Sequence, residues 1–247
     1  MLHNEAFKTD RPEIFPKDRI LSGVTHRNEK IFPQTGFSIF PSKLLDADGL
    51  VKHRSYFADF LGIDVDNIKF QKQVHEDRIR RVDKNSPIEE SDGMITDEKG
   101  IALNITIADC CAVLVYDPVN EAIGAFHSGW RGTALNISPK GINMMITEFG
   151  SNPGDILVYL SACASGENYE VGAEVAEKFS KGKIRKEKGK YLLDIKETII
   201  DSLKEIGIKQ ENIEYSSSCT ISDKQYHSYR RDKDLSGRMA AYIMMKA

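Results

Sequence analysis

The sequence lacks the features that mark membrane, secreted and nucleic-acid-binding proteins. No stretch approaches 18 apolar residues, so we expect no transmembrane helix. The first twenty residues carry charges throughout and contain no apolar segment of the kind that a secretory signal needs. The formal net charge is −3, so we expect no basic surface for nucleic acid or for an acidic membrane. These absences predict a cytoplasmic protein.

Cysteine and histidine are scarce, which limits disulfides and metal centres. The four cysteines are Cys110, Cys111, Cys163 and Cys219, and the adjacency of the first two is a poor geometry for a disulfide framework. In a reducing cytosol we expect free or metal-bound thiols. The six histidines are too few for the several imidazole-rich centres of a multicopper oxidase.

Repeats, low-complexity tracts and Gly/Ser linkers are also absent, and what remains is an ordinary globular composition. Hydrophobic residues make up 40% and charged residues 29% of the chain, so a packed core is expected. Because 247 residues lie within the range of one large domain, we expect residues 1–247 to form a single catalytic domain. The one sharp change in composition is the lysine-rich run 181–190, which predicts an exposed loop.

The hydrophobic pattern predicts helices and strands mixed without a clean βαβ rhythm, which favours the α+β class. Helices are predicted over 55–63 (ending at Gly62), 133–150 (interrupted or restarted at Pro139), 170–180 and 192–208. Strands are predicted within the first forty residues and over 68–74, 101–109, 111–117, 122–128, 156–162, 213–219 and 239–247. Residues 117–120, Asp-Pro-Val-Asn, predict a turn between two of these strands.

Three short segments place metal-ligating or nucleophilic side chains near predicted strand ends. They are QVHED (73–77), ADCC (108–111) and HSGWRG (127–132), which contain His75, Cys110 and His127. Cys110 ends one apolar run and His127 ends the next, so both side chains would reach one end of the sheet if the two strands are neighbours. The spacing by itself favours ordinary buried or surface residues at these positions.

Four separated motifs resemble one known family. They are TIADCCAVLVYDP (106–118), GAFHSGWRG (124–132), NYEVG (168–172) and CTISDKQYHSYRRDKDLSGRMAAYI (219–243). Together they resemble the laccase-domain (YfiH-like) family, formerly described as polyphenol oxidases and now understood as purine nucleoside phosphorylases. The resemblance extends from about Val51 to the end of the chain.

The resemblance implies an α+β fold with layered α/β/β/α architecture and mixed sheets, and one zinc ion held by His75, Cys110 and His127. It also implies phosphorolysis of adenosine, inosine and methylthioadenosine, with adenosine deamination as a side activity. The partners would then be a nucleoside and phosphate. The chain departs from the family's pattern at Glu76 (usually Gly), at Cys111-Ala112 (usually Leu-Pro) and over 161–168, and these departures concern substrate identity rather than the metal ligands.

The chemistry assigns roles to several further residues. Three protein ligands leave a fourth zinc position open, where bound water has a pKa near about 7 and could attack an adenine ring. Phosphorolysis needs a phosphate site, and Arg131, Arg230 and Arg231 are candidates because guanidinium binds phosphate through two hydrogen bonds; exposed ion pairs are the alternative. Asp109 is the candidate for proton transfer to the purine, or for orienting a ligand histidine.

Other functions remain open at this point. Two histidines and one cysteine are also the ligands of a blue-copper centre, so a copper-dependent polyphenol oxidase is one alternative. A metal-free hydrolase, with Cys110 as nucleophile and His127 as base, is another. A zinc-stabilised interaction module is disfavoured, because structural zinc normally has four protein ligands.

Overall fold

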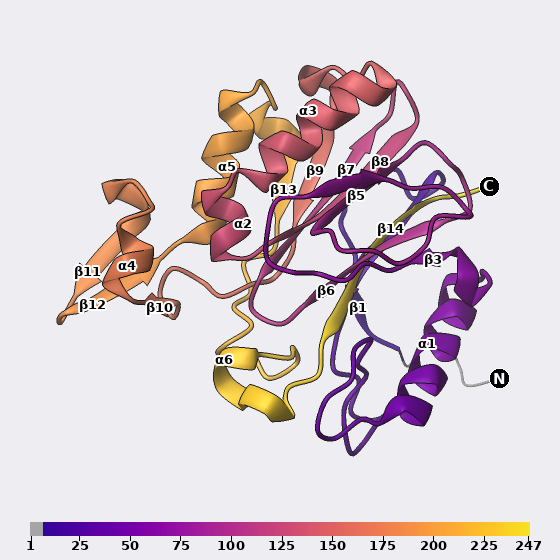
Figure 1. The fold of residues 1–247 in the computed structure, drawn as a ribbon, viewed down its shortest axis with the longest axis horizontal. Coiled ribbons are helices and arrows are strands. Elements are labelled where there is room, and N and C mark those ends of the chain that lie inside the picture. The colour runs from indigo at the N-terminus through magenta and orange to yellow at the C-terminus, as the bar shows by residue number, and fades with distance from the viewer. Residues whose placement is uncertain (1–6) are drawn as a thin grey trace.

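The computed structural model describes residues 7–247, which form two large β-sheets and one small sheet (Figure 1). The first sheet contains β1 (Thr9–Asp10), β2 (Ile20–Thr25), β3 (Ile68–Lys69), β6 (Ala102–Ile107) and β14 (Met239–Met245). The second contains β4 (Ile79–Arg81), β5 (Gly93–Thr96), β7 (Cys111–Asp117), β8 (Ala122–Ser128), β9 (Leu157–Leu160) and β13 (Ile213–Tyr215). The small sheet contains β10 (Glu170–Val171), β11 (Ile184–Glu187) and β12 (Lys190–Leu193).

Both large sheets mix parallel and antiparallel pairs. The strand order is β1-β2-β14-β6-β3 in the first sheet and β13-β9-β7-β8-β5-β4 in the second. The pairs β3/β6, β4/β5 and β9/β13 are parallel, and the other pairs are antiparallel. The predicted α+β class is therefore confirmed.

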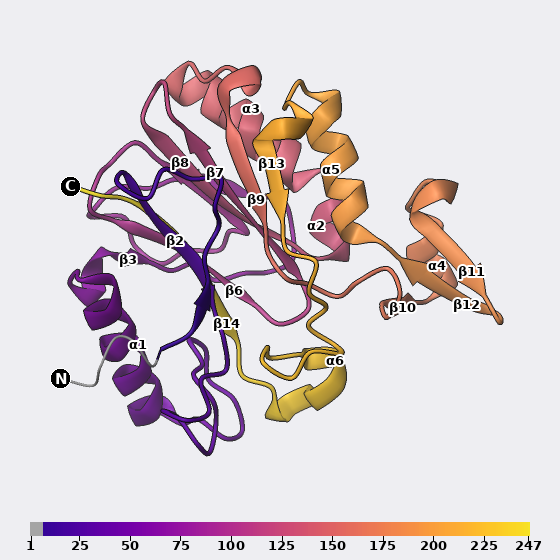
Figure 2. The same cartoon turned by 180° about the vertical axis from the view of Figure 1, so that it is seen from behind.

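Helices cover the outer faces of the two large sheets (Figures 1 and 2). Helix α1 (Ala47–Leu61) lies on the first sheet, and α3 (Ile137–Phe149) and α5 (Ile195–Glu205) lie on the second. The shorter helices are α2 (Trp130–Ala134), α4 (Ala173–Ala176) and α6 (Tyr229–Asp232). The side chains of Asp46 and Asp194 cap α1 and α5 by accepting backbone N–H bonds, and Gly62 ends α1 in a left-handed conformation. Within residues 7–247, none of the helices has the length and apolar character that a membrane crossing requires.

Three apolar cores define the layers. One core lies between the two large sheets and includes Leu103, Ile105 and Leu114. A second joins the outer face of the second sheet to α3 and α5, and a third joins the outer face of the first sheet to α1. The order α1, first sheet, second sheet, α3 with α5 is the predicted α/β/β/α arrangement.

Strand β7 shows how the sequence positions the site. Alternate residues on one side of β7 (Ala112, Leu114, Tyr116) face the core between the sheets, and those on the other side (Cys111, Val113, Val115) face the helices. A strand buried on both faces has a nearly continuous apolar sequence, as β7 has. The strand pairs with β8 so that Ala112 lies opposite His127. The two strands are neighbours, which meets the condition stated for Cys110 and His127, and their shared end carries the candidate site.

Two sequence predictions are wrong in the region of the small sheet. The lysine-rich run 181–190 is not a loop but contains β11 and the start of β12, which form a hairpin. The turn residues Lys188 and Gly189 both have positive φ, which suits the twist of a tight hairpin, and Leu193 is fully buried beside it. Residues 170–180 form β10 and the four-residue α4 rather than one helix.

Other elements exist where predicted but differ in extent. Only residues 68–69 of the expected strand 68–74 pair in a sheet, and helix α1 begins eight residues before the predicted 55–63. Asn136, with a φ of 58°, separates α2 from α3, so that Pro139 falls in the first turn of α3. A proline is tolerated there because that N–H has no partner within the helix.

Candidate metal centre and active site

The structure brings His75, Cys110 and His127 together. One ligand atom from each residue lies within 4.8 Å of the other two. His127 belongs to β8, Cys110 directly precedes β7, and His75 lies in the loop between β3 and β4. The imidazole rings of His75 and His127 are nearly perpendicular, with centroids 4.8 Å apart.

These three side chains fit a metal ion. At bond lengths of about 2.0–2.3 Å, tetrahedral zinc would hold its ligand atoms roughly 3.3–3.8 Å apart, so small side-chain movements suffice. The mixed nitrogen and sulfur donors also suit zinc or copper. Among residues 7–247 this is the one cluster of three or more His, Cys, Asp or Glu side chains with such spacing.

Asp92, which our sequence reasoning missed, holds two of the three residues in place. Its fully buried carboxylate accepts a 2.8 Å hydrogen bond from Nδ1 of His127. It also accepts backbone N–H bonds of 2.9–3.0 Å from Val74, His75 and Glu76. Because Nδ1 of His127 is occupied, Nε2 is the nitrogen available to a metal.

The backbone of His75 is left-handed, with a φ of 62°, and the bonds to the Asp92 carboxylate stabilise this conformation. A non-glycine residue in this region is uncommon and persists where its surroundings hold it. The three N–H groups that converge on Asp92 provide this support.

Gly129 gives the cysteine room. A Cβ atom at this position would lie 2.8 Å from Sγ of Cys110 and 3.6 Å from Cδ2 of His75. Any larger residue would therefore push into the ligand cluster. The conformation of Gly129 is extended rather than left-handed, so close approach is the reason for this glycine.

The metal-free site favours a thiolate beside an imidazolium. Burial would raise the pKa of the Cys110 thiol, but the charge and hydrogen bonds of the two histidines outweigh it and lower this pKa to about 6. Burial would lower the pKa of His127, but the Cys110 thiolate and the Asp92 carboxylate outweigh it and raise this pKa to about 9. A deprotonated thiolate is the form that binds a metal.

Asp109 lies beside the cluster, but both of its carboxylate oxygens have protein partners. Oδ1 accepts a 2.7 Å hydrogen bond from the Thr220 hydroxyl, and Oδ2 accepts a 2.6 Å bond from the Arg230 N–H. Its backbone is left-handed, with a φ of 84°. These contacts join the Cys110 segment to β13–α6, and they favour a positioning role for Asp109. The carboxylate that orients a candidate ligand histidine is Asp92.

A cavity of about 660 Å³ opens in front of the three candidate ligands. Its walls include the aromatic residues Phe40, Trp130, Tyr169 and Tyr229 and the cationic residues Lys72, Arg131, Arg230 and Arg238. The three guanidinium groups of the cavity each lie over an aromatic ring. The distance from Cζ to the ring centroid is 4.2 Å for Arg131 over Trp130, 5.3 Å for Arg230 over Tyr169, and 5.2 Å for Arg238 over Tyr229.

None of the ion pairs found in residues 7–247 involves Arg131, Arg230 or Arg238. Stacking on a ring fixes a guanidinium while leaving its N–H groups free for an anion. Arg231 is different: it bonds to the carbonyls of Thr220 and Tyr226 and pairs with Asp232. It does not line the cavity, and its ion pair with Asp232 corresponds to the alternative that the sequence left open for this residue.

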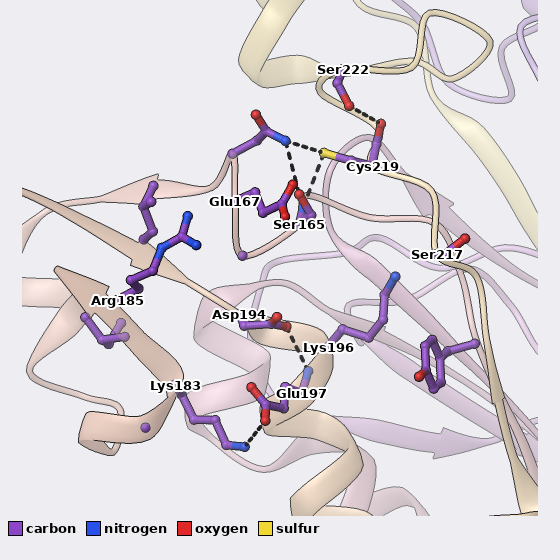
Figure 3. Close-up of a pocket in the computed structure, with 16 residues that line it drawn as sticks. Ser165, Glu167, Lys183, Arg185, Asp194, Lys196, Glu197, Ser217, Cys219 and Ser222 are labelled. Atoms are coloured by element: carbon purple, nitrogen blue, oxygen red, sulfur yellow. Dashed lines mark hydrogen bonds and ion pairs between the residues drawn. The ribbon is translucent and has the colours of Figure 1, made fainter. Parts of the chain in front are cut away.

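A second cavity, of about 830 Å³, is lined in part by the loop that contains Ser165 and Glu167 (Figure 3). Among its charged groups, Lys183 pairs with Glu197 at 3.3 Å, and the Asp194 carboxylate caps α5. Because the candidate metal cluster and the three guanidinium groups without ion pairs line the first cavity, that cavity is the candidate active site.

Comparison with known proteins agrees with this geometry. The family model described as multi-copper polyphenol oxidoreductase laccase matches residues 45–246. The chain belongs to this laccase-domain family. The match includes the three candidate ligands, Asp92, and the three guanidinium residues of the cavity.

Relatives within the family carry a different activity in their names. Purine nucleoside phosphorylase YlmD of Bacillus subtilis is 32% identical over 251 residues, which cover 92% of this chain and 89% of the relative. A purine nucleoside phosphorylase of Aquifex aeolicus is 32% identical over 174 residues, which cover 70% of this chain and 81% of the relative.

Solved structures share the fold of this laccase-domain protein. The hypothetical protein YfiH of Bacillus licheniformis superposes with a TM-score of 0.84 at 30% identity, covering 92% of this chain and 93% of the other. YlmD of Geobacillus stearothermophilus has a TM-score of 0.85 at 26% identity, covering 96% and 94%.

Proposed function

We propose that this protein is a zinc-dependent purine nucleoside phosphorylase that acts on adenosine, inosine and methylthioadenosine. The observation that carries the proposal is a single cavity in which unpaired guanidinium groups face a His-Cys-His cluster. The names of the relatives support the same reaction class. We keep adenosine deamination as a side activity to be tested in the same assay.

The cavity suits a nucleoside and phosphate together. Its volume is within the usual range for small-molecule sites, and aromatic walls such as Trp130 and Tyr169 offer flat faces to a purine. Arg131 and Arg230 can bind phosphate through paired N–H groups. Both substrates would therefore lie close to the candidate metal centre.

In the proposed reaction, a phosphate oxygen attacks C1′ of the ribose as the bond from C1′ to the purine nitrogen breaks. The electron pair of that bond goes to the purine, which takes up a proton, and ribose 1-phosphate remains. The guanidinium groups hold the phosphate and reduce its repulsion from the negative charge that develops on the departing purine. Zinc bound by His75, Cys110 and His127 would supply a Lewis acid that polarises the nucleoside.

Asp109 serves this reaction by position. Its carboxylate fixes the backbone of Arg230 and the segment that carries Cys110. A general acid must reach the purine with a carboxyl oxygen, whereas both oxygens of Asp109 are bonded to protein groups. We therefore place the proton source of the purine elsewhere in the solvated cavity.

A metal-free hydrolase is the second candidate, and one specific observation favours it. Cys110, His127 and Asp92 form a hydrogen-bonded chain like that of a cysteine hydrolase, with a thiol pKa of about 6. The position of His75 against the same sulfur favours the metal centre instead. A multicopper oxidase is disfavoured because residues 7–247 provide one such cluster rather than several.

The test is a nucleoside screen on protein purified without chelator, with and without phosphate, detecting free base and ribose 1-phosphate. We expect about one zinc per chain, little copper, and base release only when phosphate is present. Inosine formed from adenosine would report deamination. Equal base release without phosphate would make the enzyme a hydrolase, and several coppers per chain would revive the oxidase.

A further inference from the structure

Arg238 lies closer to the candidate metal centre than its place in the sequence suggests. It directly precedes β14, and β14 pairs with β6 so that Met239 lies opposite Ile107. This register sets Arg238 alongside Ala108, at the start of the segment that carries Cys110. Arg238 therefore belongs to the inner wall of the cavity.

The backbone and side chain of Arg238 are both held in place. Its N–H donates to the Ser38 hydroxyl at 2.8 Å, and its carbonyl accepts from Ile39 at 3.1 Å. Nη1 donates to the carbonyls of Ser236 and Gly237 at 2.9 Å each, and the ring of Tyr229 lies under the guanidinium. Within residues 7–247, Nε and Nη2 bond to no protein group and are not among the enclosed polar atoms, so they are available to a ligand.

The charge of Arg238 has no carboxylate partner in ion-pairing distance in the described chain. Burial lowers the pKa of Arg238, while the negative charges of Cys110 and Asp109 raise it, so these two groups act on it across the cavity. The group stays cationic at neutral pH. A half-buried cation with no partner is unfavourable by itself and is stabilised when an anion binds.

Arg131 and Arg230 differ from Arg238 in exposure. Both are exposed at the rim of the cavity, whereas Arg238 is half-buried. The Arg238 guanidinium is held by two backbone carbonyls as well as by a ring, so it loses less freedom on binding an anion than the two exposed side chains do. A reacting phosphate must also lie near C1′ of the nucleoside, and so toward the inner part of the cavity.

We propose that Arg238 binds the reacting phosphate from the inner wall of the cavity and sets its position relative to the nucleoside, while Arg131 and Arg230 close the anion site from the rim. This inference rests on the proposed phosphorolysis. It adds a third phosphate-binding residue, and it predicts that Arg238 contributes more to phosphate affinity than Arg131 and Arg230 do.

The test compares Arg238→Lys, Arg238→Ala, Arg131→Gln and Arg230→Gln, with Arg81→Gln as the control because Arg81 forms exposed ion pairs with Asp97 and Glu148. Losing a charged hydrogen-bond donor to phosphate should raise the KM for phosphate at least about tenfold in both Arg238 variants. The KM for the nucleoside should change less than about twofold. Added guanidinium chloride should partly restore Arg238→Ala, and the rim variants should show smaller effects.

Direct titration with inorganic phosphate in the absence of nucleoside, monitored by phosphorus NMR, distinguishes the proposed phosphorolysis from the proposed anion site at Arg238. If the wild type binds phosphate through Arg238 but releases no base, the proposed function fails and the anion site stands. If the wild type is phosphorolytic and Arg238→Lys keeps both its phosphate affinity and its phosphate KM, the inference is overturned. A raised nucleoside KM with an unchanged phosphate KM overturns it as well, and thermal unfolding of each variant identifies loss of fold.

Discussion

The carboxylate of Asp92 joins two candidate ligands, because it accepts a hydrogen bond from His127 and another from the backbone N–H of His75. One buried side chain therefore fixes a strand residue and a loop residue at the distance that a shared metal requires. Its pKa is lowered: burial opposes ionisation, but the bonds from His127 and from the backbone outweigh it. The carboxylate is thus ionised in the folded protein at neutral pH.

Replacing Asp92 should disrupt the site without touching a ligand. In Asp92→Asn, an amide NH₂ group would face N–H donors, so we expect the affinity for zinc to fall about 10- to 100-fold. The free energy of unfolding should fall by about 3 kcal/mol, since buried N–H groups lose a charged acceptor. Competition with a chromophoric chelator and chemical denaturation measure the two effects.

Asp97→Asn is the matched control for Asp92→Asn. Asp97 is exposed and pairs with Arg81 at the surface, so its replacement should change stability by less than about 1 kcal/mol. An Asp92→Asn protein that binds zinc as tightly as the wild type would show that this carboxylate does not orient the ligands.

Gly129→Ala tests whether the close approach of this residue to Cys110 matters. The added Cβ would lie 2.8 Å from Sγ, so either the thiol or the backbone must move. We expect zinc affinity to fall more than tenfold and turnover to fall with it, because misplaced ligands lose metal. Gly182→Ala, where an added Cβ meets nothing within 4 Å, should leave both unchanged. Equal zinc binding in the two variants would contradict the prediction.

The sequence pointed to the three candidate ligands but not to Asp92, which bonds to two of them. His75, Cys110 and His127 were found through a family resemblance carried by local motifs. Asp92 is 17 residues from His75 and 35 from His127, and Ser-Asp-Gly at 91–93 resembles an ordinary turn. Its role depends on β5 lying beside β8, a pairing that local patterns do not specify. Arg238 was within a recognised motif, but only the β6–β14 register shows what it faces.

In the small sheet, the sequence led to a wrong prediction of secondary structure. Its lysines made the segment 181–190 resemble a solvated loop, because charge obscured the alternation on which strand prediction depends. Lys188-Gly189 between Ile184 and Leu193 was the available signal for a hairpin. In contrast, β7 and β8 were predicted closely because both are apolar and a clear turn at 117–120 separates them.

The affinity for zinc should rise with pH, because His127 must lose a proton before it can bind the metal. Between pH 6 and 9 the metal-free site holds Cys110 as thiolate and His127 as imidazolium. Zinc needs the neutral imidazole, so binding at pH 7.5 should release about one proton and affinity should rise about tenfold per pH unit. Below pH 6 protonation of the thiol steepens this dependence, and above pH 9 the affinity levels off.

Calorimetry in two buffers with different ionisation enthalpies measures this proton release. The predicted difference in observed enthalpy corresponds to about one proton per zinc at pH 7.5. If no proton is released, His127 is already neutral in the metal-free protein, and the thiolate–imidazolium pair is absent.

The adjacent cysteines provide the sharpest test of the site. Cys110 borders the cavity, whereas Cys111 is fully buried and faces the core beneath α3 and α5. Cys110→Ser replaces a soft thiolate with a poor zinc ligand, so metal and activity should be lost together. Cys111→Ala should keep both and cost on the order of 1 kcal/mol of stability, as small core truncations do.

Zinc content and turnover are measured on both variants at matched concentration, after confirming that each unfolds cooperatively. If Cys110→Ser retains its zinc and yet is inactive, the thiol is a nucleophile and the hydrolase is the better function. If Cys111→Ala is the variant that loses zinc, then the sulfur that reaches the metal lies on the other side of β7. The opposite faces of these two residues make the outcomes distinguishable, because neither side chain can substitute for the other without a shift of the strand by one residue.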